Sequence, residues 1–161
     1  MTKFIQLTQG KVALVSDHRF EYLNQWKWYA RRDRNNWYAV REEDGDKIRM
    51  HRLIMGVTDP TILVDHQDGD GLNNQDDNLR KCTNTQNLYN RRINKNSTTG
   101  YKGVTWGKKE RKYLARIKVN QKTLPLGEFI DPKQAAKAYD TAARHYFGEF
   151  ARTNFNEGTT S

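Results

Sequence analysis

The chain has 161 residues, of which 35% are hydrophobic, and its mean hydropathy of −1.02 indicates two thin modules rather than one thick core. The single cysteine, Cys82, excludes a disulfide framework and a cysteine-rich zinc site within one chain, and the sequence has neither a signal peptide nor a long apolar run, so we expect a soluble intracellular protein. The net charge of +9 favours a polyanionic partner, with a merely soluble basic protein as the alternative.

The first fifty residues predict short strands and turns. Residues 11–16 form one strand candidate, "KVALVS". Aromatic and β-prone residues fill 26–32 and 36–42, and the polar 33–35 between them indicates a hairpin. After a further turn at 43–47, the chain is expected to enter a short helix.

The next segment predicts the order strand, loop, strand, helix. A β-branched run at residues 61–66 ends on Asp65 and His66, and a long polar loop follows it. Residues 78–83 form a second short strand candidate. Residues 84–92 are compatible with a helix, with Asn84 as N-cap and Leu88 facing inward.

The C-terminal part has the most regular pattern. Residues 101–106, 112–119 and 123–129 predict three strands. The segment "DPKQAAKAYDTAARHYFG" predicts a helix that has Asp131 as N-cap, begins at Pro132 and ends at Gly148. An apolar stripe rich in alanine would let this helix lie close against the sheet.

The charge is unevenly distributed along these elements. Residues 1–50 carry 10 basic and 7 acidic side chains, residues 51–90 carry 3 and 6, and residues 91–161 carry 15 and 6. An acidic centre between basic flanks is consistent with a cation-binding site in the centre and nucleic-acid binding by the flanking segments.

The acidic centre, "VDHQDGDGLNNQDDNL", allows three interpretations. A calcium loop of the EF-hand type fails, because a register from Asp68 puts Leu72 at position 5 and Leu79 at position 12. A solvated polar turn accounts for the Gly, Asn and Asp residues of the loop. It does not account for Asp65 and His66, which end an apolar strand.

The third interpretation is a metal site that hydrolyses phosphodiesters. This chemistry needs an activated water and neutralisation of charge on the phosphate. A neutral imidazole is a suitable base, and Mg²⁺ binds oxygen ligands while keeping several waters. His66 and Asp65 could provide the base and one ligand, and Asn87 in the following helix could provide another oxygen.

Residues 50–90, "MHRLIMG … VDHQDGDGLNNQDDNLRKCTNTQNLYN", resemble the HNH endonucleases of the phage and intron-encoded homing type. That family is built from two antiparallel strands and a helix around one divalent metal. The resemblance implies His66 as general base, Asp65 and Asn87 as metal ligands, and Asn78 as the middle Asn that braces the loop and orients the base.

The same resemblance extends upstream and bears on the metal. His51 and Arg52 match the family's "HR", to which we assign a structural or phosphate-contacting role. With Asn rather than His at position 87, Mg²⁺ or Mn²⁺, one per active site, is favoured over Zn²⁺.

The strand at 112–119 predicts a sheet face that contacts DNA. Lys112, Leu114, Arg116 and Lys118 share one parity, so that face is mostly cationic while the other is apolar. A basic sheet face fits DNA recognition by strands, with a solvated surface as the alternative. Lys108 adds a further cation in "GKKERK".

Residues 101–155 resemble the APETALA2/ethylene-response-factor DNA-binding domain of plants, which also occurs fused to phage HNH nucleases. The match spans nearly the whole module. The plant pattern has Arg where this chain has Lys102, and Trp where it has Pro125. The resemblance therefore implies backbone anchoring by the basic residues Lys102, Lys112, Arg116 and Lys118, but no plant sequence preference.

These observations predict an α+β protein with three parts. The ranges are 1–92 for a β-rich HNH module with its ββα-metal core at 61–92, 93–98 for a linker, and 99–156 for a three-stranded antiparallel sheet packed on one helix. We expect a monomeric, metal-dependent endonuclease that acts on double-stranded DNA, in the cytoplasm of a bacterial host if a phage encodes it. The alternatives are a DNA-binding transcriptional regulator with a remnant HNH unit and an RNA-binding basic protein.

Overall fold

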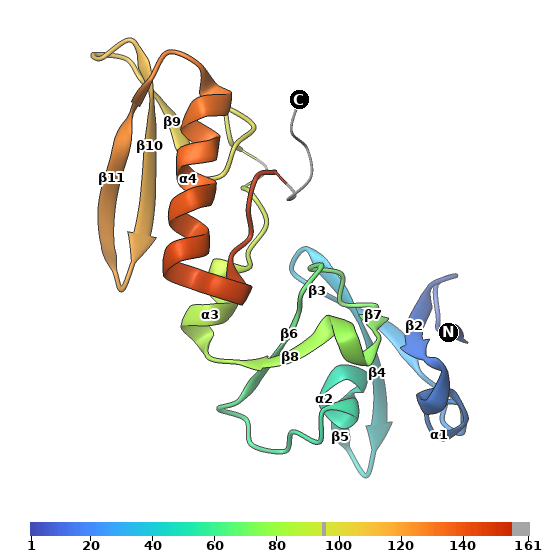
Figure 1. Ribbon diagram of the computed structural model, residues 1–161. Coiled ribbons are helices and arrows are strands. Elements are labelled where there is room, and N and C mark those ends of the chain that lie inside the picture. The colour runs from blue at the N-terminus through green and yellow to red at the C-terminus, as the bar shows by residue number, and fades with distance from the viewer. Residues whose placement is uncertain (95, 156–161) are drawn as a thin grey trace. The chain divides into compact units, whose positions relative to one another are not determined.

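The computed structural model describes residues 1–94 and 96–155 and divides into two compact units, Met1–Asn87 and Leu88–Ser161 (Figure 1). We call them the N-terminal unit and the C-terminal unit. The fold is mixed α and β, with several small sheets and few helices, which agrees with the predicted α+β class. In the part of the chain that the structure describes, no helix is long and apolar enough to cross a membrane.

A three-stranded sheet opens the N-terminal unit. Strands β1 (Thr2–Gln6) and β2 (Val12–Ser16) pair antiparallel, and the two-residue strand β7 (Asn73–Asn74) joins β2 in parallel. The prediction placed a strand at β2 but anticipated neither β1 nor β7. The parallel pair brings the acidic loop onto the N-terminal hairpin, almost sixty residues away in the chain.

A second sheet confirms the predicted aromatic hairpin. Strands β3 (Tyr29–Asp33), β4 (Asn36–Glu43) and β5 (Asp46–Arg49) follow one another antiparallel. Two short helices, α1 (Phe20–Asn24) and α2 (Met50–Ile54), pack near these sheets. The core is made of small and aliphatic side chains with one tryptophan: Ile5, Leu7, Ala13, Val15, Leu23, Trp28, Ala30, Ala39, Met50, Ile54 and Leu79.

Strands β6 (Leu63–His66) and β8 (Leu79–Cys82) pair antiparallel and precede helix α3 (Asn84–Tyr89), in the predicted order. Helix α3 starts with a capping box. The Thr83 hydroxyl accepts from the Gln86 N–H at 3.2 Å, and the Gln86 side chain accepts from the Thr83 N–H at 2.9 Å. Thr83, rather than Asn84, therefore caps the helix.

The C-terminal unit confirms the predicted sheet and helix. Strands β9 (Val104–Gly107), β10 (Lys112–Val119) and β11 (Lys122–Phe129) are antiparallel in the order β11-β10-β9. Helix α4 (Pro132–Phe147) lies across one face of this sheet (Figure 1). The Asp131 side chain accepts from the Lys133 N–H at 2.9 Å, and Gly148 after the helix has a φ of 51°.

The segment that follows Asn87 packs within the C-terminal unit. The ring of Tyr89 stacks on Phe147 with centroids 3.7 Å apart, and the Tyr89 carbonyl accepts from Lys102 Nζ at 2.6 Å. Leu88 is 53% exposed, so its predicted inward orientation is wrong. Residue 95 of the predicted linker and residue 156 of the predicted DNA-binding domain lie outside the described residues.

Candidate active site

Asp65 lies at the end of β6 directly opposite Arg80 on β8. Two guanidinium N–H groups of Arg80 donate to Asp65 Oδ2, from Nε at 3.1 Å and from a terminal nitrogen at 2.9 Å. Both residues are buried, Asp65 at 6% and Arg80 at 9% exposure. The Arg80 guanidinium offsets part of the hydration that the buried Asp65 carboxylate loses.

His66 follows Asp65 and is equally buried, at 5% exposure. Its Nε2 lies 3.3 Å from the side-chain oxygen of Asn74 in β7. Burial lowers the pKa of His66 below its ordinary value, while the hydrogen bond to Asn74 and the nearby carboxylates act in the opposite direction. The His66 imidazole is thus largely dehydrated, and this dehydration favours its neutral, basic form.

Two aromatic rings enclose the His66 imidazole. His51 in α2 meets it edge-on, with ring centroids 5.0 Å apart and planes at 76°, and Tyr38 in β4 lies at 6.0 Å. His51 is 4% exposed, and its Nδ1 has no hydrogen-bond partner among residues 1–94 and 96–155. Burial, together with the positive charges around it, lowers the pKa of His51 to about 2.

His51 and Arg52 differ in their surroundings. His51 is enclosed by the rings of Tyr38 and His66. The Arg52 guanidinium donates to the carbonyls of Ile62 at 2.8 Å and Asp59 at 2.7 Å. These contacts hold the segment that leads from α2 into β6.

Asn78 ties the polar loop together. Its side-chain N–H groups donate to Asp68 Oδ1 at 3.0 Å and to the Asn73 carbonyl at 2.8 Å, while its oxygen accepts from the Asp68 N–H at 3.0 Å. Its backbone carbonyl accepts from the Gln67 N–H at 2.9 Å. Asn78 thus holds the two ends of the loop, whereas the Asn74 side chain is the one that lies against His66 Nε2.

Gly71 sets how closely the loop approaches β4. A Cβ atom at this position would collide with the Trp37 carbonyl oxygen and lie 2.7 Å from the nearest ring atom of Tyr38. Only glycine allows this approach, and the same tyrosine ring contacts both His51 and His66. The loop is therefore seated on one of the rings that enclose the imidazole.

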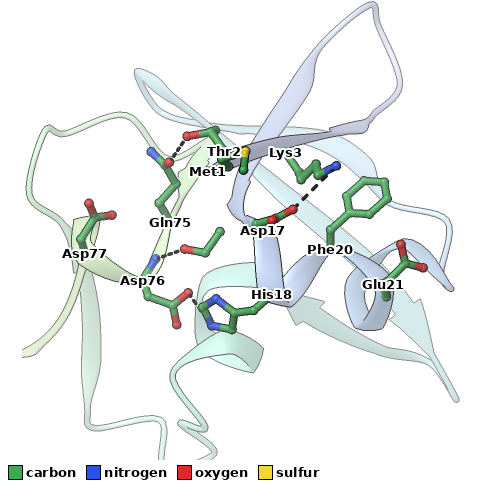
Figure 2. A pocket seen from close by; sticks show the side chains of 11 residues that line it. Met1, Thr2, Lys3, Asp17, His18, Phe20, Glu21, Gln75, Asp76 and Asp77 are labelled. Carbon is green, nitrogen blue, oxygen red and sulfur yellow. Dashed lines mark hydrogen bonds and ion pairs between the residues drawn. The ribbon is translucent and has the colours of Figure 1, made fainter.

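The N-terminal hairpin holds the residues that follow Asn74. Figure 2 shows Thr2 bonded to the Gln75 side chain, and Asp76 bonded through its N–H to Ser16 Oγ at 2.9 Å. Arg19 donates to Asp76 Oδ1 at 2.8 Å. The open pocket in this figure is lined by the N-terminal hairpin and residues 75–77, and its lining includes none of Asp65, His66 and Asn87.

Asn87 is exposed on α3, where its N–H donates to the Thr83 carbonyl at 3.0 Å. In the described ranges, 1–94 and 96–155, no three His, Cys, Asp or Glu side chains form a metal-binding group. Asp65 and Asn87 together offer one carboxylate and one amide oxygen, which is the donor chemistry of a hard cation that keeps several waters. Burial raises the pKa of the Cys82 thiol to about 11, so this thiol is not a nucleophile at neutral pH.

The predicted DNA-contacting cations of the C-terminal unit differ in their surroundings. Four are exposed: Lys108, Lys112, Arg116 and Lys118. Arg116 and Lys118 flank the buried Ile117 on β10, so they point away from α4, as the alternation predicted. Lys112 pairs with Glu128 at 3.4 Å.

Lys102 is partly buried and bonded within the C-terminal unit. Its Nζ donates to the Tyr89 carbonyl, and burial is the main cause that lowers its pKa, to about 8. An exposed tryptophan on the neighbouring strand was not singled out from the sequence: Trp106 is 46% exposed and packs edge-on against Tyr113 at 4.9 Å.

Three residues near His66 were missed as well. Arg80 could have been predicted, because the segment "NLRKC" places a cation on the strand that pairs with the strand of Asp65. The contacts of Asn74 and Tyr38 had no local signal, because a two-residue strand and a ring-to-ring contact depend on tertiary packing.

No family model matches the chain, but comparison with known proteins finds several relatives. An uncharacterized HNH endonuclease of Acanthamoeba polyphaga mimivirus is 33% identical over 151 residues, which is 91% of this chain and 76% of the relative. Protein 3.8 of Escherichia phage T7 is 32% identical over 105 residues, covering 65% of this chain and 86% of that protein. The dehydration-responsive element-binding protein 2A of Oryza sativa is 41% identical over 70 residues, 40% of this chain but 24% of the rice protein.

Proposed function

Because the chain belongs to the HNH endonuclease family, we propose that it is a divalent-metal-dependent DNA endonuclease that hydrolyses phosphodiester bonds. The C-terminal unit helps to select the site on double-stranded DNA, a role supported by the similarity of 70 residues of the chain to part of a plant element-binding protein. The observation that carries the proposal is the pair Asp65–His66 at the end of β6, where a buried carboxylate adjoins a dehydrated imidazole.

His66 acts as the general base. Its imidazole accepts a proton from a water molecule, whose oxygen attacks the phosphorus, and the bond between phosphorus and the leaving oxygen breaks. The lowered pKa of His66 keeps the ring neutral at pH 7, so the base is ready without prior deprotonation. The rings of His51 and Tyr38 restrict how the imidazole can turn.

Asp65 and Asn87 would hold Mg²⁺ or Mn²⁺. A cation there supplies neutralising charge for the scissile phosphate and the leaving oxygen. In the structure, Arg80 pairs with Asp65 and orients this carboxylate within the strand pair. Asn78 holds the ends of the loop that separates β6 from β8.

The exposed cations of β10 and of the turn before it would contact phosphates. Because Arg116 and Lys118 share the sheet face opposite α4, they can bind one DNA backbone together. With one active site per chain, a monomer is expected to nick one strand.

The test is cleavage of supercoiled plasmid by the purified full chain. Nicked product is expected with Mg²⁺ or Mn²⁺ and not with EDTA, and His66→Ala is expected to abolish it. His145→Ala is the control, because His145 is exposed on α4 and lies outside the motif. If wild-type and His66→Ala proteins give the same amount of product, or if DNA is bound without any cleavage, the chain is a DNA-binding protein and not a nuclease.

A further inference from the structure

The sheet of β3, β4 and β5 is polarised in charge along its strands. Because the strands follow one another antiparallel, the β3–β4 turn and the β4–β5 turn lie at opposite ends of the sheet (Figure 1). Residues 31–36, around the first turn, carry three arginines and one aspartate, whereas residues 42–47, around the second turn, carry four acidic side chains and one lysine. We call these the basic end and the acidic end of the sheet. A polyanion is attracted to the first and repelled by the second.

The arginines at the basic end, Arg31, Arg32 and Arg34, are all exposed. Within the described ranges, 1–94 and 96–155, their guanidinium groups form no hydrogen bond and no ion pair. The acidic side chain at this end, Asp33, is engaged by Arg49 at 3.2 Å. The basic end therefore presents three guanidinium groups to solvent, and a guanidinium can donate two parallel hydrogen bonds to one phosphate.

Arg31 connects the basic end to the candidate active site. It lies directly opposite Tyr38 in the β3–β4 pair. Directly opposed residues of an antiparallel pair share a face of the sheet and have Cβ atoms about 5 Å apart, so Arg31 emerges beside the Tyr38 side chain. The centroid of the Tyr38 ring lies 6.0 Å from that of the His66 imidazole. One aromatic side chain thus separates this exposed cation from the proposed general base.

The loop between β6 and β8 is attached to the same end of the sheet. The Asn36 side chain, at the start of β4, donates to the Gly69 carbonyl at 3.0 Å and accepts from the Gly71 N–H at 3.3 Å. The close approach of Gly71 to the Trp37 carbonyl oxygen belongs to this contact. A DNA backbone that lies across the basic end would therefore also lie beside this loop.

We propose that the β3–β4 hairpin is a second DNA-binding surface, which holds the backbone of double-stranded DNA next to the cleavage site through Arg31, Arg32 and Arg34. A two-stranded ribbon fits the major groove of DNA, where contacts to phosphates position a protein on the duplex. The proposal rests on the proposed function for DNA as the partner. It goes beyond that function by giving the N-terminal unit its own affinity for DNA.

The test measures binding of the full chain to double-stranded DNA in EDTA, so that cleavage does not interfere. Fluorescence anisotropy at several salt concentrations gives the slope of log affinity against log salt. Arg31→Gln and Arg34→Gln together remove two phosphate contacts and are expected to reduce this slope by about 2. Lys27→Gln and Lys47→Gln together are the matched control and are expected to leave the slope unchanged. Both lysines are exposed, one before β3 and one on β5 at the acidic end, and the loss of net charge is the same.

A second pair of variants adds charge instead of removing it. Asn35→Lys places one more cation at the β3–β4 turn, and Asp46→Asn makes the same change in net charge at the acidic end. Both positions are exposed. Asn35→Lys is expected to steepen the salt dependence by about 1, and Asp46→Asn is expected to leave it unchanged. This pair gives the answer even where the arginine variants do not fold.

Matched variants that change the slope equally, or hairpin variants that do not change it, would overturn the proposal. The measurement is independent of cleavage. A chain whose hairpin variants behave as expected but which cuts no plasmid contradicts the proposed nuclease activity and leaves the DNA-binding hairpin standing. A chain that nicks plasmid through His66, but whose hairpin variants match their controls, keeps the nuclease activity and refutes the hairpin.

Discussion

At the scale of single residues, Arg80 is the side chain on which Asp65 depends. Replacing one partner of a buried ion pair leaves the other charge without compensation. We expect Arg80→Met to destabilise the protein by about 3 kcal/mol, and we expect Mg²⁺ to raise the melting temperature of this variant more than that of wild type, because Asp65 is no longer neutralised.

Lys81→Met is the matched control for Arg80→Met. Lys81 is exposed on the same strand, and its replacement makes the same change in net charge. Thermal unfolding of both variants with and without Mg²⁺ measures the effect. Equal losses of stability in the two variants would show that the Asp65–Arg80 pair contributes no more to stability than an exposed lysine.

The two buried histidines predict a loss of stability in acid. The pKa values of His51 and His66 are lowered in the folded protein, so below the ordinary histidine pKa the unfolded chain binds more protons than the folded one. Their contribution is complete above about pH 6.5 and declines as the pH falls below it. Urea unfolding at pH 7.5 and pH 5 is expected to give a lower midpoint at pH 5.

His51→Phe provides the comparison for this pH dependence. Phenylalanine keeps a ring against His66 and Tyr38 but removes one titrating group. The difference between the two midpoints is expected to shrink in this variant. A difference as large as that of wild type would place the acid sensitivity elsewhere in the protein.

At the scale of elements, two aspartates of unequal importance hold helix α4, one at its N-terminus and one near its middle. Asp131 caps the helix with one hydrogen bond and is partly exposed. Asp140 is 2% exposed and accepts from the Asn154 N–H at 2.7 Å, the Asn154 side chain at 2.9 Å and the Phe155 N–H at 2.9 Å. Asp140 thus binds the chain after the helix back onto it.

These contacts predict an order of stabilities. Asp131→Ala is expected to cost about 1 kcal/mol, the usual value for an N-cap. Asp140→Ala is expected to cost about 3 kcal/mol, because it leaves three partly buried donors without their acceptor. Chemical denaturation monitored by near-ultraviolet circular dichroism measures the free energy of unfolding of both variants. An equal or reversed order of the two losses would contradict the role of Asp140 in holding the chain after α4.

The elements that were predicted from the sequence are those with a strong local pattern. Strand β10 alternates over eight residues, and α4 has an N-cap, a proline at its start and a glycine at its end, so both were placed correctly. Strand β7 has two residues and exists only because β2 pairs with it. The motif located Asp65, His66 and His51, but Asn74 and Tyr38, which also contact His66, come from two other strands and had no local signal.

At the scale of the whole molecule, the distribution of cations predicts that the affinity for DNA falls as the salt concentration rises. Each phosphate contact releases counterions, so removing two contacts is expected to reduce the slope of log affinity against log salt by about 2. We expect this from the full chain with Arg116→Gln and Lys118→Gln together, measured by fluorescence anisotropy on double-stranded DNA over a range of salt concentrations.

Lys133→Gln and Lys137→Gln together are the control for charge alone. Both lysines are exposed on α4, which covers the opposite face of the sheet, and the loss of net charge is the same. If the two double variants change the slope equally, net charge rather than the β10 face governs binding.

The pairing of β2 with β7 has a consequence for how the chain folds. Residues 14 and 15 pair with residues 73 and 74, so this contact closes a long loop of the chain. The entropic cost of closing the loop is lower once the intervening hairpin and helices have formed, and we therefore expect the β2–β7 pair to form after them. A segment limited to residues 61–92 would contain every motif residue and still lack the strand on which Asn74 rests. We therefore expect the site around His66 to be among the last parts of the N-terminal unit to acquire its native geometry, which would delay any cleavage of DNA until folding of that unit is nearly complete.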